Sequence, residues 1–146
     1  MNMCDGSVAS GRALFRVADV VFDTSFFIDL RRGNSPSASE LWDSVEAGQV
    51  TGAYSAVTVY ELWAGRSFSR DEELFYLSNF ALLEDLAISS SAAQSAGLWL
   101  RGRPDISEKL FRDALIAAAA EEDGAAVCTR NVRDFQRFPS IQIRPY

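Results

Sequence analysis

The sequence has 146 residues, with 14 Lys and Arg against 20 Asp and Glu, a formal net charge of -6 and no histidine. A chain of this length with 48% hydrophobic residues has room for one core, so we expect a single globular domain and exclude the disordered, collagen-like and coiled-coil classes. Without histidine, carboxylates are the candidate catalytic acids, bases and metal ligands. The acidic charge argues against a broad basic surface for nucleic acids, because Lys and Arg supply most non-specific affinity for phosphates.

The first 18 residues are small and polar without a clear period, so we expect an N-terminal extension over 1–18 and a domain over 19–146. No apolar leader and no run of about 20 apolar residues is present, which predicts a protein that is neither exported nor membrane-spanning. The two cysteines, Cys4 and Cys128, form no C-x-x-C pair. Two free thiols suit a reducing compartment, and we expect a cytoplasmic protein.

Short apolar runs alternate with helical segments along the rest of the chain. Strands are predicted over 19–22, 50–54, 82–88, 125–128 and 141–144, and helices over 25–32, 37–47, 55–64, 70–81, 91–100 and from 105 or 107 to 123. The run at 19–22 does not alternate with polar residues, as expected of a central strand buried on both faces. This order predicts an α/β domain with a mostly parallel sheet covered by helices on both sides. Neither a G-x-G-x-x-G motif nor a phosphate-binding loop is present, so no nucleotide cofactor is expected.

Two acidic residues stand at the end of, or within, apolar segments. Asp23 ends the first predicted strand, and ligands of open α/β sheets bind at the carboxyl ends of strands. A helix N-cap is the alternative role for Asp23. Glu61 is the only charge in the run at 56–64, a helix that is apolar almost all round and is therefore expected to be largely buried. The alternative is that Glu61 points to water.

Asp113 is the third such residue. It lies three residues after Leu110 and four before Ala117, on one apolar stripe of the last long helix, whose alanines let it pack close to the sheet. An ion pair with Arg112 would be the structural alternative, but adjacent residues do not face each other on a helix. We therefore favour a functional role for Asp113.

A polar cluster follows the strand that ends at Cys128, at another carboxyl end of the sheet, and contains Thr129, Asn131 and Asp134. A turn with an Asn cap is the alternative. Carboxylates that converge without histidine select Mg²⁺ or Mn²⁺ over zinc. Such a site polarises a phosphate oxygen and activates water, so the predicted reaction class is metal-assisted phosphodiester hydrolysis.

The sequence resembles a PIN domain, most closely the ribonuclease toxin of VapBC-type toxin-antitoxin pairs. The similar segments are VVFDTSFFIDL at 20–30, SAVTVYELWAG at 55–65, FRDALIAAAAEEDGAAVCTRNVRDF at 111–135 and the closing FPSIQIRPY. The resemblance implies a five-stranded, Rossmann-like three-layer α/β/α fold, Mg²⁺-dependent endoribonuclease activity, a homodimer and inhibition by a VapB-type antitoxin.

The resemblance also implies roles for single residues. Asp23, Glu61 and Asp113 match the family's metal-site and catalytic acids. Many members carry an aspartate two residues after the threonine of the following strand, whereas this chain has Asn131 there and Asp134 three residues later. Either residue can complete the site: Asn131 can bind metal or water through its amide oxygen, and Asp134 can support the ligands without binding the metal directly. The polar positions that match, and that would hold water or phosphate, are Thr24, Ser25 and Thr129.

Arginines supply 13 of the 14 basic residues and often follow the acidic segments. Arginine binds phosphate with a bidentate fork and stacks on unpaired bases, which suits single-stranded loops of folded RNA. The candidate RNA-binding residues are Arg32, Arg66, Arg130 and Arg133; solvated helix ends are the alternative for each. Two other functions remain open. One is a non-catalytic PIN-fold module that binds RNA or protein, which is suggested by Asn131 at the position of a family aspartate. The other is a phosphatase with Asp23 as nucleophile; that class carries a D-x-D-x-T motif, and Ser25 in place of its second aspartate disfavours it.

Overall fold

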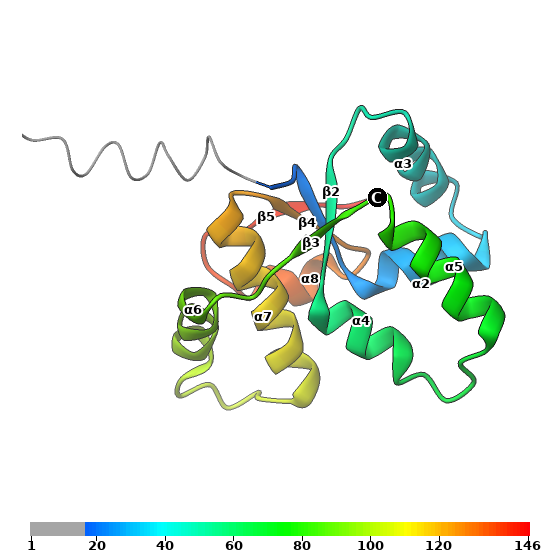
Figure 1. The fold of residues 1–146 in the computed structure, drawn as a ribbon. Coiled ribbons are helices and arrows are strands. Elements are labelled where there is room, and N and C mark those ends of the chain that lie inside the picture. The colour runs from blue at the N-terminus through cyan, green and yellow to red at the C-terminus, as the bar shows by residue number, and fades with distance from the viewer. Residues whose placement is uncertain (1–16) are drawn as a thin grey trace, which may run out of the picture.

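The computed structural model describes residues 17–146, in which five strands alternate with seven helices (Figure 1). The strands are β1 (Val20–Phe22), β2 (Gly52–Ser55), β3 (Glu84–Leu86), β4 (Ala126–Cys128) and β5 (Gln142–Arg144). The helices are α2 (Thr24–Arg32), α3 (Pro36–Glu46), α4 (Ala56–Trp63), α5 (Arg70–Phe80), α6 (Ser90–Leu100), α7 (Glu108–Asp123) and α8 (Val132–Phe135). All strand pairings are parallel, in the order β3-β2-β1-β4-β5, which confirms the predicted α/β class and five-stranded sheet.

The strand β1 is central, as its unbroken apolar run predicts. Val20, Val21 and Phe22 are all buried. Val20 pairs with Gly52 of β2 on one side and with Ala126 of β4 on the other. The residues that follow β1 and β4 therefore leave the sheet side by side at its carboxyl edge.

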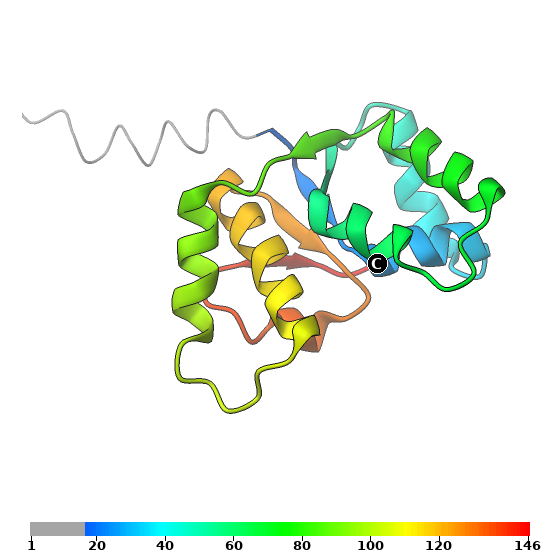
Figure 2. The ribbon, with the colours of Figure 1, turned by 60° about the horizontal axis from the view of Figure 1, so that its bottom comes forward.

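Helices cover both faces of the sheet and form two cores (Figure 2). On one face, α6 and α7 pack through small residues, with Ala114, Ala117 and Ala118 of α7 fully buried. On the other face, α2, α3 and α5 enclose an aromatic core. Its rings include Phe22, Phe26, Phe27, Trp42, Tyr76 and Phe80. This arrangement confirms the three-layer sandwich.

The start of the described chain is bound to the end of α7. The backbone N–H groups of Val17 and Ala18 donate to the Asp123 carboxylate, at 2.7 Å to Oδ1 and 3.1 Å to Oδ2. Ala18 also belongs to the core on the α6 and α7 face. The last two residues of the expected extension are thus packed on the domain, while 1–16, with Cys4, lie outside the described residues. No helix within 17–146 has the length and apolar character needed to cross a membrane.

Two expectations about local structure were wrong. No helix was predicted after β4, but the segment contains the short helix α8, which is held because Phe135 is completely buried. The helix at 56–64 was expected to be largely buried, but only Thr58 and Leu62 of α4 are, and Tyr60 is 63% exposed. One face of α4 looks to solvent because this helix packs at the carboxyl edge of the sheet between α2 and α7, not on a sheet face.

Candidate active site

Asp23 lies directly after β1 and is 4% exposed. It stands at the N-cap position of α2, but its side chain does not cap the helix. Its Oδ2 instead accepts hydrogen bonds from the hydroxyls of Thr129 (3.0 Å) and Ser25 (3.1 Å). Burial raises the pKa of Asp23, an effect that the hydroxyl donors oppose and the nearby Glu61 charge reinforces. The carboxylate is thus fixed in a position where its charge is poorly compensated.

Glu61 is carried by α4, whose N-terminus is capped by the Ser55 hydroxyl. One carboxylate oxygen accepts a hydrogen bond of 2.7 Å from the Thr24 hydroxyl, and the other accepts one of 3.0 Å from Arg112 Nε. Its side chain is 18% exposed, so Glu61 is neither free in solvent nor enclosed in the core. The ion pair with α7 and the bond to α2 direct Glu61 toward the end of β1.

Asp113 is buried on α7, as its place on the apolar stripe predicts. Its Oδ2 lies 2.8 Å from Lys109 Nζ, one turn earlier on the same helix, and Arg112 pairs with Glu61 instead. Burial is the largest cause that raises the pKa of Asp113 to about 6; the lysine opposes it, while Asp23 and Glu61 add to it. The three acids therefore influence one another electrostatically.

One cavity of about 160 Å³ brings these residues together at the carboxyl edge of the sheet. Its lining residues are Asp23, Thr24, Ser25, Ile28, Glu61, Lys109, Asp113, Arg130 and Asn131. Side chains from β1, α2, α4, α7 and the β4 end thus share one space, although they are up to about 108 residues apart in the sequence. Within residues 17–146, no group of three or more acidic or cysteine side chains is already arranged as a set of metal ligands.

The residues after β4 occupy different places around this cavity. Thr129 is completely buried and donates to Asp23, and its Oγ1 accepts a hydrogen bond of 2.8 Å from the Asn131 N–H. Asn131 lines the cavity, whereas Asp134 on α8 does not. Asp134 is connected to the site through Lys109, at 3.1 Å, and also pairs with Arg137. Of the two alternatives left open by the sequence, Asn131 is the one at the cavity wall.

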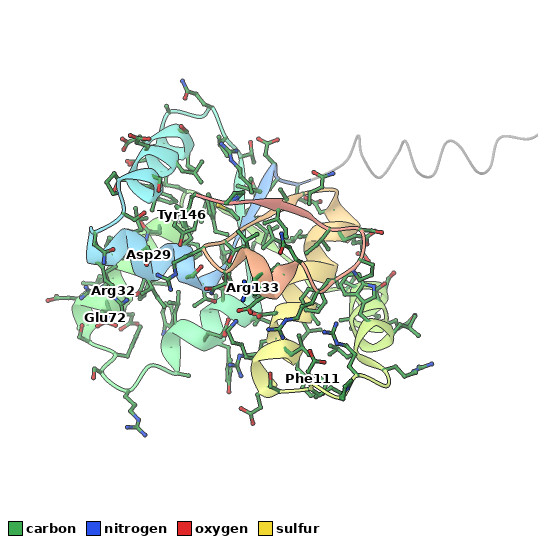
Figure 3. The ribbon with its side chains drawn as sticks, turned by 180° about the vertical axis from the view of Figure 1, so that it is seen from behind. Asp29, Arg32, Glu72, Phe111, Arg133 and Tyr146 are labelled. Atoms are coloured by element: carbon green, nitrogen blue, oxygen red, sulfur yellow. The ribbon has the colours of Figure 1, made fainter. Side chains whose placement is uncertain are left out.

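The four candidate arginines are spread over the surface around the site. Arg130 lines the cavity itself. Arg32, labelled in Figure 3, lines a neighbouring cavity of about 240 Å³ that shares Ile28 and Glu61 with the first. Arg66 and Arg133 are exposed and line neither of these two cavities. The structure therefore brings two of the four predicted arginines to the carboxylates.

Three charged residues that sequence reasoning did not select form ion pairs with residues of the site. Lys109 and Arg112 neutralise Asp113 and Glu61, and the buried Asp29 of α2 pairs with Arg130. A signal for Lys109 was present, since it is four residues before Asp113 and is the chain's single lysine. The pairs Glu61–Arg112 and Asp29–Arg130 join residues far apart in the sequence, so only the fold reveals them.

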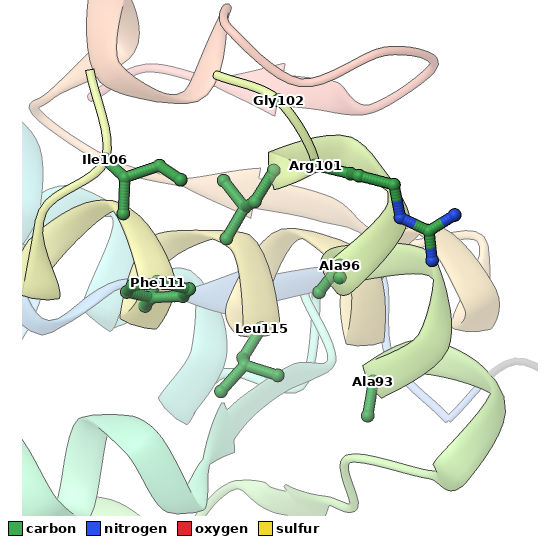
Figure 4. A pocket seen from close by; sticks show the side chains of 9 residues that line it. Ala93, Ala96, Arg101, Gly102, Ile106, Phe111 and Leu115 are labelled. Atoms are coloured by element: carbon green, nitrogen blue, oxygen red, sulfur yellow. The ribbon is translucent and has the colours of Figure 1, made fainter. Parts of the chain in front are cut away.

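A larger, apolar cavity of about 410 Å³ lies away from the carboxylates, between α6, the following loop and α7 (Figure 4). Phe111 and Leu115 of α7 line it opposite Ala93 and Ala96 of α6. These α7 residues are about half a turn round the helix from Lys109 and Asp113. The helix thus presents one face to the acidic cavity and another to the apolar groove.

Solved structures show the same fold. A chain of the VapBC2 complex from Rickettsia felis, bound to a promoter DNA fragment, is 23% identical with a TM-score of 0.69, over 87% of this chain and 98% of that chain. A chain of DNA-bound VapBC from Salmonella typhimurium is 24% identical with a TM-score of 0.69, over 88% of this chain and 98% of that chain. A chain of VapBC-1 from nontypeable Haemophilus influenzae is 25% identical with a TM-score of 0.63, over 86% of this chain and 96% of that chain. A search of curated proteins found no match.

A model of the PIN domain matches residues 20–140, from the first residue of β1 to the segment after α8. The matched region includes every residue that lines the acidic cavity. It covers most of the sequence, and the sheet order and helix layers agree with the expected fold. The chain therefore belongs to the PIN domain family.

Proposed function

We propose that this PIN domain is a VapC-type toxin that hydrolyses RNA phosphodiester bonds with the help of a divalent metal ion. The observation that carries the proposal is the convergence of Asp23, Glu61 and Asp113 on one cavity at the carboxyl edge of the sheet. The three acids come from β1, α4 and α7, and no structural need of those elements requires their carboxylates to meet. The proposed products are a 5′-phosphate and a 3′-hydroxyl.

The residues around the cavity fit a hard divalent cation. Their donors are carboxylate, hydroxyl and amide oxygens, which Mg²⁺ and Mn²⁺ prefer. Burial and mutual repulsion raise the pKa of both Asp23 and Asp113, which means that their negative charge is not fully compensated by the surrounding residues. Asp23, Asp113 and Glu61 would hold the ion, with Asn131 as a further oxygen donor. A bound ion of this kind polarises a phosphate oxygen and lowers the pKa of its water.

The surrounding residues keep the acids in place for that task. Thr129 and Ser25 donate to the same oxygen of Asp23, which leaves Oδ1 without either of these donors. Arg112 and Thr24 hold the two oxygens of Glu61. Lys109 bridges Asp113 and Asp134, so it balances charge at the site and keeps α8 beside α7. These contacts preorganise the cavity, because the side chains are oriented before substrate binds.

RNA is the proposed substrate because arginines adjoin the acidic cavity. Arg130 lies on its wall, and Arg32 lines the neighbouring cavity that shares Glu61. Guanidinium groups at these points would bind the phosphates on either side of the cleaved bond. The chain is acidic overall, so we expect RNA affinity to depend on the divalent ion, which neutralises the phosphates, and to be weak without it.

The proposed partners follow from the similar structures, which are VapBC complexes. We infer that a VapB-type antitoxin, encoded beside this chain, covers the site and suppresses cleavage, and that the toxin is a cytoplasmic homodimer. A short reading frame next to the gene would support the antitoxin, and its absence would favour a solitary PIN nuclease.

RNA cleavage by the purified, antitoxin-free protein tests the proposed activity. We expect cleavage with Mg²⁺ or Mn²⁺ that stops with EDTA, and a loss of at least about 100-fold in the Asp23→Asn and Asp113→Asn variants. The matched control is Asp43→Asn, an exposed aspartate of α3 that does not line the cavity. Full cleavage by both site variants would refute the assignment.

Calorimetric titration with Mn²⁺ separates the catalytic proposal from a non-catalytic binding module. Stoichiometric binding that Asp23→Asn abolishes is expected for the nuclease, whereas a degenerate site would show none. Turnover of a small phosphate monoester without RNA cleavage would instead favour a phosphatase with Asp23 as nucleophile.

A further inference from the structure

Asp29 is a buried carboxylate that the proposed hydrolysis does not use. It lies on α2, one turn after Ser25, and is 4% exposed. One of its oxygens pairs with Arg130 NH1, and the other accepts a hydrogen bond of 2.6 Å from the hydroxyl of Tyr146. Both oxygens are thus occupied, and the carboxylate has one fixed orientation toward Arg130.

Tyr146 anchors this pair from the other side. Its ring packs edge-on against Phe26, with centroids 5.2 Å apart, and it lies beside Asp29 in Figure 3. Burial, followed by the hydrogen bond to Asp29, raises the pKa of Tyr146, so the phenol remains a proton donor at neutral pH. The second residue after β5 is therefore bonded to α2, the helix that follows β1.

Arg130 connects this buried pair to the acidic cavity. Its backbone N–H lies 3.4 Å from Ser25 Oγ, and that hydroxyl donates to Asp23. Its side chain is 51% exposed and lines the cavity, while one NH1 contact holds it to Asp29. A guanidinium has five N–H donors, so most of them stay available to a ligand.

Stability alone gives a weak reason for this arrangement. Burying a carboxylate costs free energy that an ion pair only partly repays, and apolar replacements of buried pairs are often neutral or stabilising. A pair in which one partner is buried and the other lines the cavity is typical of a side chain held for binding.

We propose that Asp29 and Tyr146 are positioning residues that hold the Arg130 guanidinium at the cavity wall, where it binds a phosphate of single-stranded RNA beside the cleaved bond. This inference rests on the proposed function and extends it to two residues outside the carboxylate set. Asp29 acts through Arg130 and does not contact the RNA.

The test is a double-mutant cycle on RNA affinity. The probe is fluorescein-labelled oligo(U), bound in the presence of Ca²⁺ and followed by fluorescence anisotropy over a series of salt concentrations, with its integrity checked on a gel. Arg130→Met should weaken binding about tenfold and lower the slope of log K against log salt by about 0.7, as expected for one lost phosphate contact on a single strand. Asp29→Asn should weaken binding about three- to fivefold, and the double variant should be no weaker than Arg130→Met alone.

Tyr146→Phe is a milder variant that keeps the ring and removes only the hydroxyl, and it should change affinity in the same direction. The matched control is the exposed ion pair Arg103–Asp105 after α6; Arg103→Met and Asp105→Asn should leave probe affinity unchanged. Thermal melting of every variant separates unfolding from lost binding.

Three results would overturn the inference: unchanged affinity and slope in Asp29→Asn, losses that add in the double variant, or tighter binding by Asp29→Asn, which would mean that Asp29 competes with phosphate. These outcomes differ from a failure of the proposed function. A non-additive cycle, together with wild-type protein that cleaves no RNA with Mg²⁺ or Mn²⁺, would refute the hydrolysis and retain the positioning role. Cleavage by the wild type, together with losses that add in the double variant, would retain the hydrolysis and refute the positioning role.

Discussion

Lys109 Nζ lies 2.8 Å from Asp113 Oδ2 and 3.1 Å from Asp134 Oδ2, so one ammonium bridges a buried carboxylate of α7 and a carboxylate of α8. The side chain of Lys109 is 51% exposed, whereas that of Asp113 is 5% exposed. Among residues 17–146, the only positive charge paired with Asp113 is therefore carried by a side chain that can swing into solvent. A divalent ion that binds Asp113 would compete with this lysine for the same oxygen.

We predict that Lys109→Met increases the affinity for Mn²⁺. Two unit charges about 4 Å apart interact by about 4 kcal/mol at an effective dielectric constant of about 20, and solvent and salt reduce this further. An affinity gain of roughly three- to tenfold is expected in calorimetric titrations. The metal-free variant should also melt at a lower temperature, because Asp113 loses its partner.

Arg137→Met is the matched control for this prediction. Arg137 pairs with Asp134 Oδ1 and, within residues 17–146, forms no ion pair with Asp113. Its removal should leave Mn²⁺ affinity within about twofold of wild type. An equal gain in both variants would mean that net charge, and not the lysine bridge, controls metal binding.

The stability of the metal-free protein should depend on the ionisation of Asp113. Burial raises the pKa of this residue to about 6, from an ordinary value of 3.8. The folded state therefore holds the proton more tightly than the unfolded state, and the stabilisation is complete below about pH 4 and lost as pH rises through about 6. Relative to Asp113→Asn, wild type in EDTA should lose about 2–3 kcal/mol of unfolding free energy by pH 7.

Urea unfolding at several pH values between about 4 and 8 checks this difference. Asp105→Asn provides a control of opposite sign, since the hydrogen bond from Arg103 lowers the pKa of Asp105. Any stabilisation from Asp105 is present above its unfolded pKa and is lost as pH falls. A constant difference between wild type and Asp113→Asn over the whole range would show that Asp113 titrates normally.

The sheet could be predicted because its inner strands β1 and β4 are short apolar runs and its helices carry clear caps, whereas the edge strands β3 and β5 contain charged and polar residues. Ser55, Ser69, Ser89 and Ser107 all accept a hydrogen bond from the third residue of the helix that follows. The helix α8 escaped prediction because its four residues contain a single buried anchor, Phe135. A helix of one turn has no periodicity to detect.

The positions of the three acids also followed from the sequence, because each interrupts or ends an apolar segment. The long-range partners of the carboxylates around the site did not. The contacts of Glu61 with Arg112 and of Asp29 with Arg130 join residues 51 and 101 positions apart. Such pairs depend on how α2, α4 and α7 meet at the sheet edge, and spacing along one helix carries no information about that geometry. The exposed side of α4 could not be predicted for the same reason, because it also depends on where this helix packs at the sheet edge.

Gly52 is a position where the close packing of the sheet can be tested. A Cβ atom there would meet Phe22 Cε2 at 2.4 Å and Leu83 Cδ2 at 2.8 Å. Gly52→Ala should therefore destabilise the protein by about 1–3 kcal/mol, as overpacking of a core does, and disturb Phe22, which precedes Asp23. Gly97→Ala is the control, because within residues 17–146 no atom outside its chain neighbours and the adjacent helix backbone lies within 4 Å of its Cβ position, and alanine favours the helix α6 by up to about 1 kcal/mol. Opposite shifts in melting temperature are expected, and a neutral Gly52→Ala would contradict this packing.

The boundary of the domain can be located through Asp123. Its carboxylate accepts the backbone N–H groups of Val17 and Ala18, so Asp123→Ala should cost about 1–3 kcal/mol by removing both acceptors. A chain that begins at Asp19 should lose a similar amount relative to one that begins at Val17. Combining the truncation with Asp123→Ala should add little, because both remove the same bonds. Full additivity in urea unfolding would show that Asp123 stabilises α7 in another way.

Thr129→Val tests whether the orientation of Asp23 matters for the proposed cleavage. The substitution keeps the shape of a completely buried side chain and removes the hydroxyl that donates to Asp23 Oδ2 at 3.0 Å and accepts from the Asn131 N–H at 2.8 Å. A buried carboxylate that loses one of two donors is less firmly held, so kcat for RNA cleavage should fall by about tenfold or more while KM changes little. Thr129→Ser keeps the hydroxyl and should recover most of the rate. Equal losses in the two variants would contradict a role for the hydroxyl, because Thr129→Ser keeps that group and Thr129→Val removes it.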